Sequence, residues 1–308
     1  MKAWIALALA LPALVWAARV GDHRGSHNST ITMNDDGASD DCTEHLRVYN
    51  DDFRTNVRDE ETSSLPNQPL TITAGHNGGV QVTTWDKGEF ALKLCKQVSA
   101  NDESQGRRLL AETKLEISGG QVTVRTPEHE GDFSLGTLLL IKAPKDATLD
   151  LSVYNGGVSL NHFAGTATAH ARNGGISIKN SSGKLTVEAQ NGGVSIKDCG
   201  GDINADVQNG GISLALPERW EGKGLEAHTH NGGLVVEVPK NLQAGLEIVG
   251  SNHTSIICKD EVCGDAQRTW DDDGRKIVRI GGSETQIRAT TVNGGVVVKQ
   301  RGHSRGEL

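Results

Sequence analysis

Two histidines and two carboxylates recur at one position of a repeating pattern in this chain: His170, Glu188, Asp206 and, after a longer interval, His228. Imidazoles and carboxylates bind divalent metals and transfer protons at neutral pH. Four such residues brought side by side could form a weak metal site or an acid pair. An ordinary solvated strand face is the simpler interpretation, and we favour it. A second set recurs two positions later, comprising Tyr154, Arg172, Gln190, Gln208 and His230.

These residues stand at fixed distances from a tripeptide, Asn-Gly-Gly. The tripeptide occurs seven times and is always followed by an apolar residue. Four consecutive occurrences are 18 residues apart. A fixed period of this kind indicates an array of one small structural unit. The seven copies begin at Asn77, Asn155, Asn173, Asn191, Asn209, Asn231 and Asn293.

Within the copies that begin at Asn155, Asn173 and Asn191, the third and fifth following positions are apolar and the residue between them is serine. This alternation predicts a strand with one buried face. A second alternating stretch follows in each copy, after a second corner that contains glycine, at Gly165 in the first. Each copy therefore predicts a strand, a turn, a second strand and a second turn.

Two all-β architectures could use this unit. Asn-Gly is a strong hairpin signal, so an antiparallel meander is one alternative. The constant coil length and the fixed position of both corners favour the other, a single-stranded β-solenoid with coils of about 18 residues that stack roughly 4.8 Å apart. In that fold we expect each corner Asn to adopt a left-handed backbone conformation. We also expect the Asn side chains to hydrogen-bond along the stack, as in amide ladders.

The start of the chain has the features of a secretory signal peptide. Lys2 precedes an apolar run that ends in small residues, which predicts a signal peptide over 1–17 with cleavage after Ala17. Residues 18–64 are polar and are expected to be partly disordered. The protein is therefore expected to be exported, to the periplasm, the cell surface or the medium.

The β-solenoid is expected to cover residues 65–300, followed by a polar tail over 301–308. Its coils are regular over 155–238, and an irregular insertion covers 251–273. Helical spacing over 101–114 predicts one short helix. The copy at Asn293 is expected to form the last coil.

Export makes disulfides possible, and the chain has five cysteines. Cys258 and Cys263 are close enough in sequence to close a small loop. Cys42 and Cys95 could pair across the N-terminal half, which would leave Cys199 free. The spacing of the cysteines lacks the clustered pairs typical of zinc sites.

Composition argues against several functional classes. The net charge is −8 and the basic residues do not cluster, which disfavours nucleic acid as a partner. No segment after the signal peptide is long and apolar enough to span a bilayer. The sequence contains no GxSxG or HExxH motif and no glycine-rich phosphate loop, so we predict no catalytic residues and no cofactor.

The order of these motifs resembles a known family. An LTITAGHNGGVQVTTWD segment precedes a charged stretch, then LLLIKAPKDATLDLSVYNGG, then repeated coils with a proline-bearing LALPERW. Over about residues 65–300 this is similar to a bacterial adhesin-like domain family of unknown function, of the DUF4097 type. The resemblance implies a β-solenoid on an exported protein, and it implies no catalytic residue.

The sequence thus predicts an exported, non-catalytic scaffold that binds a surface or envelope ligand, either a glycan or a surface protein. The alternatives are a polysaccharide-active enzyme on a β-helix and a purely structural envelope spacer. Trp220 and Trp270 lie where the 18-residue rule breaks, so they could form a ligand-binding edge or cap the solenoid. Open solenoid ends would also permit end-to-end self-association.

Overall fold

We describe the fold from a computed structural model, for residues 16–20, 29–33, 39–50, 53, 55–127, 132–258 and 260–302. Strands dominate this part of the chain, which confirms the predicted all-β class. The helical elements are α1 (Cys42–His45), α2 (Glu103–Glu112) and one turn of 3-10 helix, η1 (Glu261–Cys263). Helix α2 lies within the predicted helical segment, and Asp102 caps its first turn by accepting a hydrogen bond from the backbone N–H of Gln105 at 2.9 Å.

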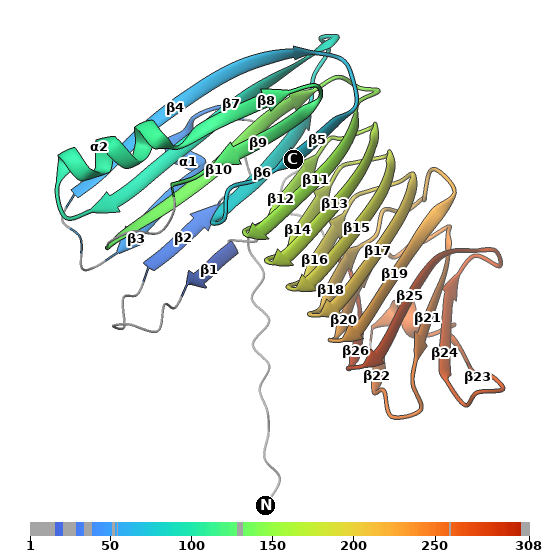
Figure 1. The fold of residues 1–308 in the computed structure, drawn as a ribbon. Helices are drawn as coiled ribbons and strands as arrows, with labels where there is room; N and C mark the ends of the chain where they lie inside the picture. Colours follow the sequence, from blue (N-terminus) through green and yellow to red (C-terminus); the bar gives the residue numbers. More distant parts are fainter. Residues whose placement is uncertain are drawn as a thin grey trace, which may run out of the picture.

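Most strands belong to two large sheets that face each other along the molecule (Figure 1). The eleven-stranded sheet contains, in spatial order, β22 (Ile256–Cys258), β26 (Val296–Gln300), β20 (Leu234–Val238), β18 (Ile212–Ala215), β16 (Val194–Lys197), β14 (Ile176–Lys179), β12 (Val158–Asn161), β6 (Gly78–Thr84), β10 (Phe133–Ala143), β7 (Glu89–Ala100) and β4 (Thr55–Pro66). The twelve-stranded sheet contains β23 (Gln267–Trp270), β24 (Lys276–Gly281), β21 (Gly245–Gly250), β25 (Thr285–Asn293), β19 (Gly224–Asn231), β17 (Asp202–Asn209), β15 (Lys184–Asn191), β13 (Thr166–Asn173), β11 (Thr148–Asn155), β5 (Leu70–Thr73), β9 (Gln121–Arg125) and β8 (Lys114–Ser118).

Consecutive coils pair in parallel and in register. Asn173 lies opposite Asn191 in the twelve-stranded sheet, and Ser177 lies opposite Ser195 in the eleven-stranded sheet. This pairing excludes the antiparallel meander for these coils. Each coil contributes one strand to each of two sheets, so the term single-stranded does not describe the arrangement. We call the coiled region, β11 to β20 with β25 and β26, the stack.

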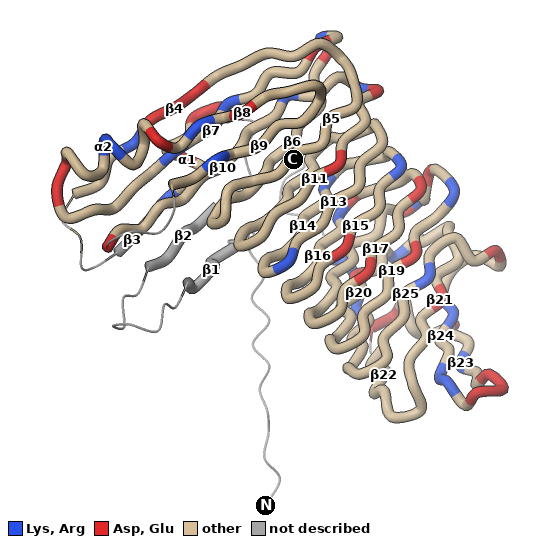
Figure 2. Tube along the Cα trace, in the orientation of Figure 1, with Lys and Arg blue, Asp and Glu red and all other residues tan. Residues whose placement is uncertain are grey.

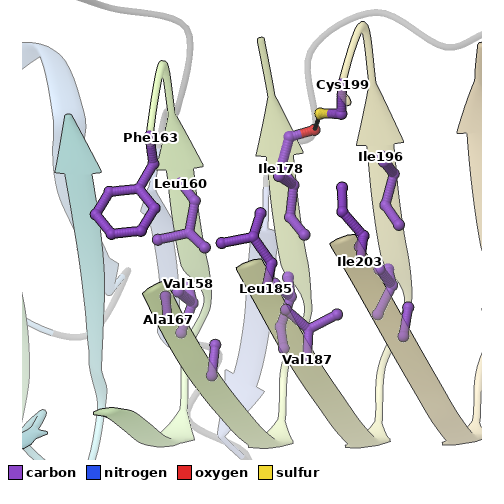
Figure 3. Packing of buried hydrophobic residues seen from close by; sticks show 14 of the residues in the cluster. Val158, Leu160, Phe163, Ala167, Ile178, Leu185, Val187, Ile196, Cys199 and Ile203 are labelled. Carbon is purple, nitrogen blue, oxygen red and sulfur yellow. Dashed lines mark hydrogen bonds between the residues drawn. The ribbon is translucent and has the colours of Figure 1, made fainter. Parts of the chain in front are cut away.

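The core of the stack is narrow and mainly aliphatic. The side chains of Ile178, Leu185, Val187 and Ile196 point inward from the two sheets and are at most 2 % exposed (Figure 3). Their alternation along each strand is the pattern that the sequence shows. Cys199, at the edge of this core, donates from Sγ to the carbonyl of Ile178 at 3.6 Å (Figure 3).

At the Asn-Gly-Gly corner, the first glycine is required by the close approach of neighbouring coils. A Cβ at Gly192 would lie 1.9 Å from the carbonyl oxygen of Gly174, and one at Gly174 would lie 1.8 Å from that of Gly156. These distances are far inside van der Waals contact. A Cβ at the second glycine, Gly193, would meet its nearest neighbour, the oxygen of Gly211, at 3.0 Å. The two glycines of the tripeptide are therefore not equivalent.

The Asn side chains form the predicted amide ladder. Asn173 Nδ2 donates to Asn155 Oδ1 at 3.0 Å, and Asn191 repeats this contact on Asn173 at 3.0 Å. Each of these side chains is donor to one neighbour and acceptor from the next. The same contact links all seven residues, which in order along the stack are Asn77, Asn155, Asn173, Asn191, Asn209, Asn231 and Asn293.

The expected left-handed conformation of these Asn residues is wrong. From Asn155 onward, the Asn of each tripeptide is the last residue of a strand in the twelve-stranded sheet, as Asn173 is of β13. Among the residues that the structure describes, the left-handed non-glycine residues are instead His162, Asn180 and Asp198, with φ of 52°, 49° and 52°, in one column at the second corner. The chain passes from one sheet to the other at both corners, but only the second corner uses a left-handed non-glycine residue, in three successive coils.

The copy at Asn293 is last in the sequence but not in space. Strand β25 lies between β19 and β21, and β26 lies between β20 and β22. Arg288 on β25 pairs with Glu247 on β21 at 3.5 Å, and Lys299 on β26 pairs with Glu237 on β20 at 2.8 Å. The C-terminal coil is thus inserted between two segments that precede it, and a sequence period cannot reveal this order.

The N-terminal part covers one end of the stack. Strands β4, β7 and β10 pair antiparallel, and β10 continues the parallel sheet through β6. Helix α2 packs on β4 and β7. Buried Lys96 of β7 pairs with Asp59 Oδ2 at 2.7 Å and donates to the carbonyl of Thr113 beyond α2 at 3.3 Å. The hydrogen bond from Lys96 lowers the pKa of Asp59 below its usual range.

The partial disorder expected over 18–64 stays a prediction, and the structure describes strands within this range. A three-stranded antiparallel sheet is formed by β1 (Trp16–Val20), β2 (Ser29–Met33) and β3 (Leu46–Asn50). The predicted cleavage point after Ala17 falls within β1, and residues 1–15 lie outside the described residues. The alternating sequence of 29–33 is too short to stand out from its polar surroundings, and pairing with β3 decides its conformation.

Two disulfides join the cysteine pairs named from the sequence. Cys42 bonds to Cys95 and links α1 to β7, and Cys258 bonds to Cys263 and closes a small loop. Cys199 is unpaired and 3 % exposed, and burial raises the pKa of its thiol to about 11.

The corner geometry predicts unequal effects for two neighbouring substitutions. Gly192→Ala should destabilise the chain by about 3 kcal/mol or more, because its Cβ can be accommodated only if the backbones of two coils separate. Gly193→Ala should cost about 1 kcal/mol. Urea unfolding midpoints measure both. Equal destabilisation by the two variants would contradict the close-approach explanation.

The two disulfides should differ in their contribution to stability. The bond between Cys42 and Cys95 spans 53 residues, and the other spans 5. Loop entropy in the unfolded chain predicts that the double Ala variant of the long-range pair loses about 4 kcal/mol, and that of the short-range pair about 2 kcal/mol. Non-reducing urea titrations test this order, and a reversed order would count against it.

The Cys199 thiol should be unreactive in the folded protein. Its burial and its raised pKa, about 11, leave almost no accessible thiolate at pH 8. Ellman's reagent should therefore detect no thiol in the native chain and one per chain in denaturant without reductant. The Cys199→Ser variant is the control and should give none in either state. A stoichiometric reaction with the native chain would disprove the assignment.

Candidate functional site

The first recurring set forms one column on the outer face of the twelve-stranded sheet. His170 on β13 lies opposite Ser152 on β11 and Glu188 on β15. Asp206 on β17 lies opposite Glu188 and His228 on β19. The register predicted from the 18-residue period therefore holds across this column. It also holds across the longer interval before His228, because the four extra residues are accommodated in the second corner.

The second set forms an adjacent column, one position before the Asn ladder. Its members are Tyr154, Arg172, Gln190, Gln208 and His230. His76 extends the column at the N-terminal end, where its ring stacks on Tyr154 with centroids 4.6 Å apart. The guanidinium of Arg172 lies 4.8 Å from the Tyr154 centroid. The Tyr154 ring thus contacts a neighbour from each adjacent strand position in the column, and Tyr154 is 37 % exposed.

A groove of about 750 Å³ lies over the two columns and spans five strands. We call it the coil groove. Its middle is lined by Glu188, Gln190, Asp206 and Gln208, and histidines lie toward both ends. The lining residues are Ser152, Val153, His170, Ala171, Arg172, Glu188, Ala189, Gln190, Asp206, Gln208, His228 and His230.

The electrostatics of the coil groove are mixed. His170 Nδ1 lies 3.1 Å from Glu188 Oε2, and both side chains are substantially exposed. Asp206 stands beside Glu188 and His228 in the sheet register. Along the stack as a whole, acidic and basic positions are interspersed without a block of one sign (Figure 2). The groove therefore presents hydrogen-bonding groups of both kinds to a ligand.

The first column also contains the weak metal candidates named from the sequence. Adjacent strands are about 4.8 Å apart, so successive side chains of the column lie in a line. Among the residues that the structure describes, no group of three or more His, Cys, Asp and Glu could hold a metal. The weak metal hypothesis for His170, Glu188, Asp206 and His228 stays a prediction from the sequence.

The two tryptophans named from the sequence have different environments. Trp220 is 4 % exposed, packs in the core and donates from Nε1 to the carbonyl of Gly201 at 3.1 Å. It closes the second corner and is not part of a ligand-binding edge. Trp270 on β23 is 65 % exposed, with Lys276 Nζ 5.7 Å from the centroid of the ring.

The irregular segment 251–273 contributes to a second hollow at the C-terminal end of the stack. This end cleft has a volume of about 620 Å³ and is lined by residues of three segments, 238–242, 261–267 and 279–283. The break in the 18-residue period points to one of these segments. The other two were not predicted, because they are brought together by the antiparallel pairing of β21 with β24, where Gly245 lies opposite Gly281.

No helix in the described part of the chain is long and apolar enough to cross a membrane. No protein-family model matches the chain, and no curated protein matches it. The resemblance to the adhesin-like family therefore rests on the motifs alone.

Several solved bacterial structures resemble the chain weakly. A candidate cell adhesion protein from Clostridium sporogenes is 11% identical, with 80% of this chain and 100% of that chain covered and a TM-score of 0.31. A candidate adhesin from Bacteroides fragilis is 12% identical, with 79% and 97% covered and a TM-score of 0.30. A candidate adhesin from Parabacteroides merdae is 11% identical, with 78% and 96% covered and a TM-score of 0.28. Similarities at this level carry no argument about this chain.

Proposed function

We propose that this protein is an exported, non-catalytic β-solenoid scaffold of the adhesin-like kind, and that its coil groove binds an extended glycan. The observation that carries the proposal is the register of the two columns. Four successive strands, β13 to β19, present polar side chains at the same two positions along one groove of about 750 Å³, and Ser152 of β11 extends the first position. A ligand that repeats along its length fits a surface that repeats along its length.

The side chains of the groove suit sugar hydroxyls. The carboxylates of Glu188 and Asp206 accept hydrogen bonds, and the amides of Gln190 and Gln208 both donate and accept. A sugar hydroxyl also both donates and accepts, so many weak hydrogen bonds can together hold a glycan. The five strands extend over about 19 Å at roughly 4.8 Å per strand, which is long enough for several sugar rings.

Two further observations support export. Residues 1–17 have the pattern of a secretory signal peptide. Four of the five cysteines are paired in disulfides, which persist in oxidising compartments.

Two other functions remain as alternatives and are separable by experiment. Hydrolysis or cleavage of the bound glycan by the purified protein would indicate a polysaccharide-active enzyme. An intact fold that binds no glycan or surface protein in an array would indicate an envelope spacer.

A glycan array with the exported chain identifies the ligand, and calorimetry then tests the site. The Gln190→Ala/Gln208→Ala double variant should weaken binding by about tenfold or more, because several hydrogen bonds to the ligand are lost. Thr186→Ala is the matched control, since Thr186 lies on the outer face of the same β15 strand but does not line the groove. Unchanged binding by the double variant would place the glycan elsewhere.

A further inference from the structure

At the N-terminal end, both large sheets end in strands with features that discourage pairing with another chain. The eleven-stranded sheet ends there in β4, which carries the acidic run Asp59 to Glu61. Charged residues along an edge strand oppose the approach of a further strand. The twelve-stranded sheet ends there in β8, where the backbone N–H of Leu115 already donates to Glu61 Oε2 at 3.2 Å. These two edges are therefore poor partners for a second strand.

The edge at the C-terminal end of the twelve-stranded sheet is different. It is formed by β23, whose four residues are all exposed and include no proline or acidic residue. Among the described strands, β23 pairs only with β24, and this hairpin projects from the end of the stack (Figure 1). Trp270 of β23 is 65 % exposed, the largest value for a large hydrophobic side chain in the described part of the chain. This edge is therefore accessible to another strand.

The backbone groups on the free edge of β23 belong to Arg268 and Trp270. At the turn into β24, the N–H of Asp271 donates to the carbonyl of Arg275 at 3.1 Å. Hydrogen-bonded pairs alternate along an antiparallel ladder, so Thr269 forms the next bonded pair with β24. The N–H and C=O groups of Arg268 and Trp270 thus point away from β24, and no described strand pairs with them.

The side chains of this edge are complementary to themselves. Lys276 Nζ, on β24, lies 5.7 Å from the Trp270 centroid. Arg268 precedes Trp270 by two residues, so both side chains lie on the same face of the sheet. When two copies of β23 pair antiparallel about Thr269, Arg268 of each copy lies opposite Trp270 of the other. Both residues then use their free N–H and C=O groups, and each guanidinium lies beside an indole ring, which is a favourable contact.

Other registers of the same pairing are less favourable. Pairing about Arg268 would place the two Arg268 side chains opposite each other, and like charges in that position repel. Pairing about Trp270 would extend into the turn that follows β23. Pairing about a point between two residues would match free backbone groups with groups already bonded to β24. The acidic turn adds little repulsion, because Arg275 pairs with Asp271 at 2.7 Å and with Asp273 at 3.4 Å.

We propose that this protein forms a two-fold symmetric dimer in which the β23 edges of two copies pair antiparallel about Thr269. The twelve-stranded sheets of the two copies then form one continuous sheet. Each copy uses the same surface, so the contact closes at two copies and does not propagate into a filament. The interface is small, because each copy contributes one short strand, and the association is therefore reversible. The proposal does not depend on the coil groove.

The first test traps the register. In the proposed pairing the two Thr269 residues lie opposite each other in a non-hydrogen-bonded pair, where Cα atoms are about 4.5 Å apart and a disulfide can form. Thr269→Cys, incubated with oxidised glutathione, should therefore give a covalent dimer on a non-reducing gel. Gln267→Cys is the matched control, because Gln267 is exposed on the same face of β23 but its two copies would lie roughly 14 Å apart. The parent chain, whose free Cys199 is buried, should give no covalent dimer.

The second test measures the association without an added cysteine. Sedimentation velocity of the exported chain from about 10 μM to about 1 mM should show the mass rising toward that of a dimer. Trp270→Ala should weaken dimerisation about tenfold. Arg268→Pro should abolish it, because the free N–H and the guanidinium are lost while the hydrogen bonds to β24 are kept. Tyr49→Ala, which removes an exposed aromatic ring from the three-stranded sheet, should have no effect.

A monomer at every concentration, equal trapping of the two Cys variants, or an unchanged dimer in Arg268→Pro would overturn the proposal. A mass that rises beyond two copies would also overturn it, because it would indicate open end-to-end assembly. The Gln190→Ala/Gln208→Ala variant should dimerise as the parent chain does, so a failure of the coil groove as a glycan site leaves these tests intact.

Discussion

The close approach of successive backbones at the Asn-Gly-Gly corner is the constraint on which the rest of the structure depends. A side chain at the first glycine would lie within 1.8–2.1 Å of a carbonyl oxygen in the neighbouring coil. Only glycine permits this contact, and the contact fixes how far apart the coils lie and how they are aligned. The Asn ladder then adds one hydrogen bond between each pair of neighbouring coils.

Register at the corner has a direct consequence for the surface. Once Asn173 lies opposite Asn191, every residue at the same distance from the tripeptide lies opposite its counterpart. Side chains thus gather in columns without any further interaction to place them. The coil groove is a product of this alignment, and its chemistry can change residue by residue while the scaffold remains the same.

The two ends of the stack are built differently from its middle, because no further coil covers them. The N-terminal end is covered by antiparallel strands and α2, which bring their own buried residues. At the other end the C-terminal coil is inserted between earlier segments, held by Arg288, Lys299 and the last Asn of the ladder. This arrangement leaves a short disulfide-closed loop over the core edge, and the end cleft lies beside it.

The sequence by itself determined what depends on local spacing: the all-β class, the 18-residue coil, the inward positions, the Asn ladder and the two columns, His170 to His228 and Tyr154 to His230. It did not determine that each coil divides between two sheets, or that Trp220 is buried while Trp270 is exposed. It misassigned the left-handed residues, because strand pairing extends the ladder Asn residues from Asn155 onward, and the left-handed conformation occurs at His162, Asn180 and Asp198. The order of the last coils and the end cleft were decided only by tertiary structure. The insertion of β25 and β26 places segments that are far apart in the chain next to each other. No local sequence pattern indicates which strand edges of the sheets remain free to pair.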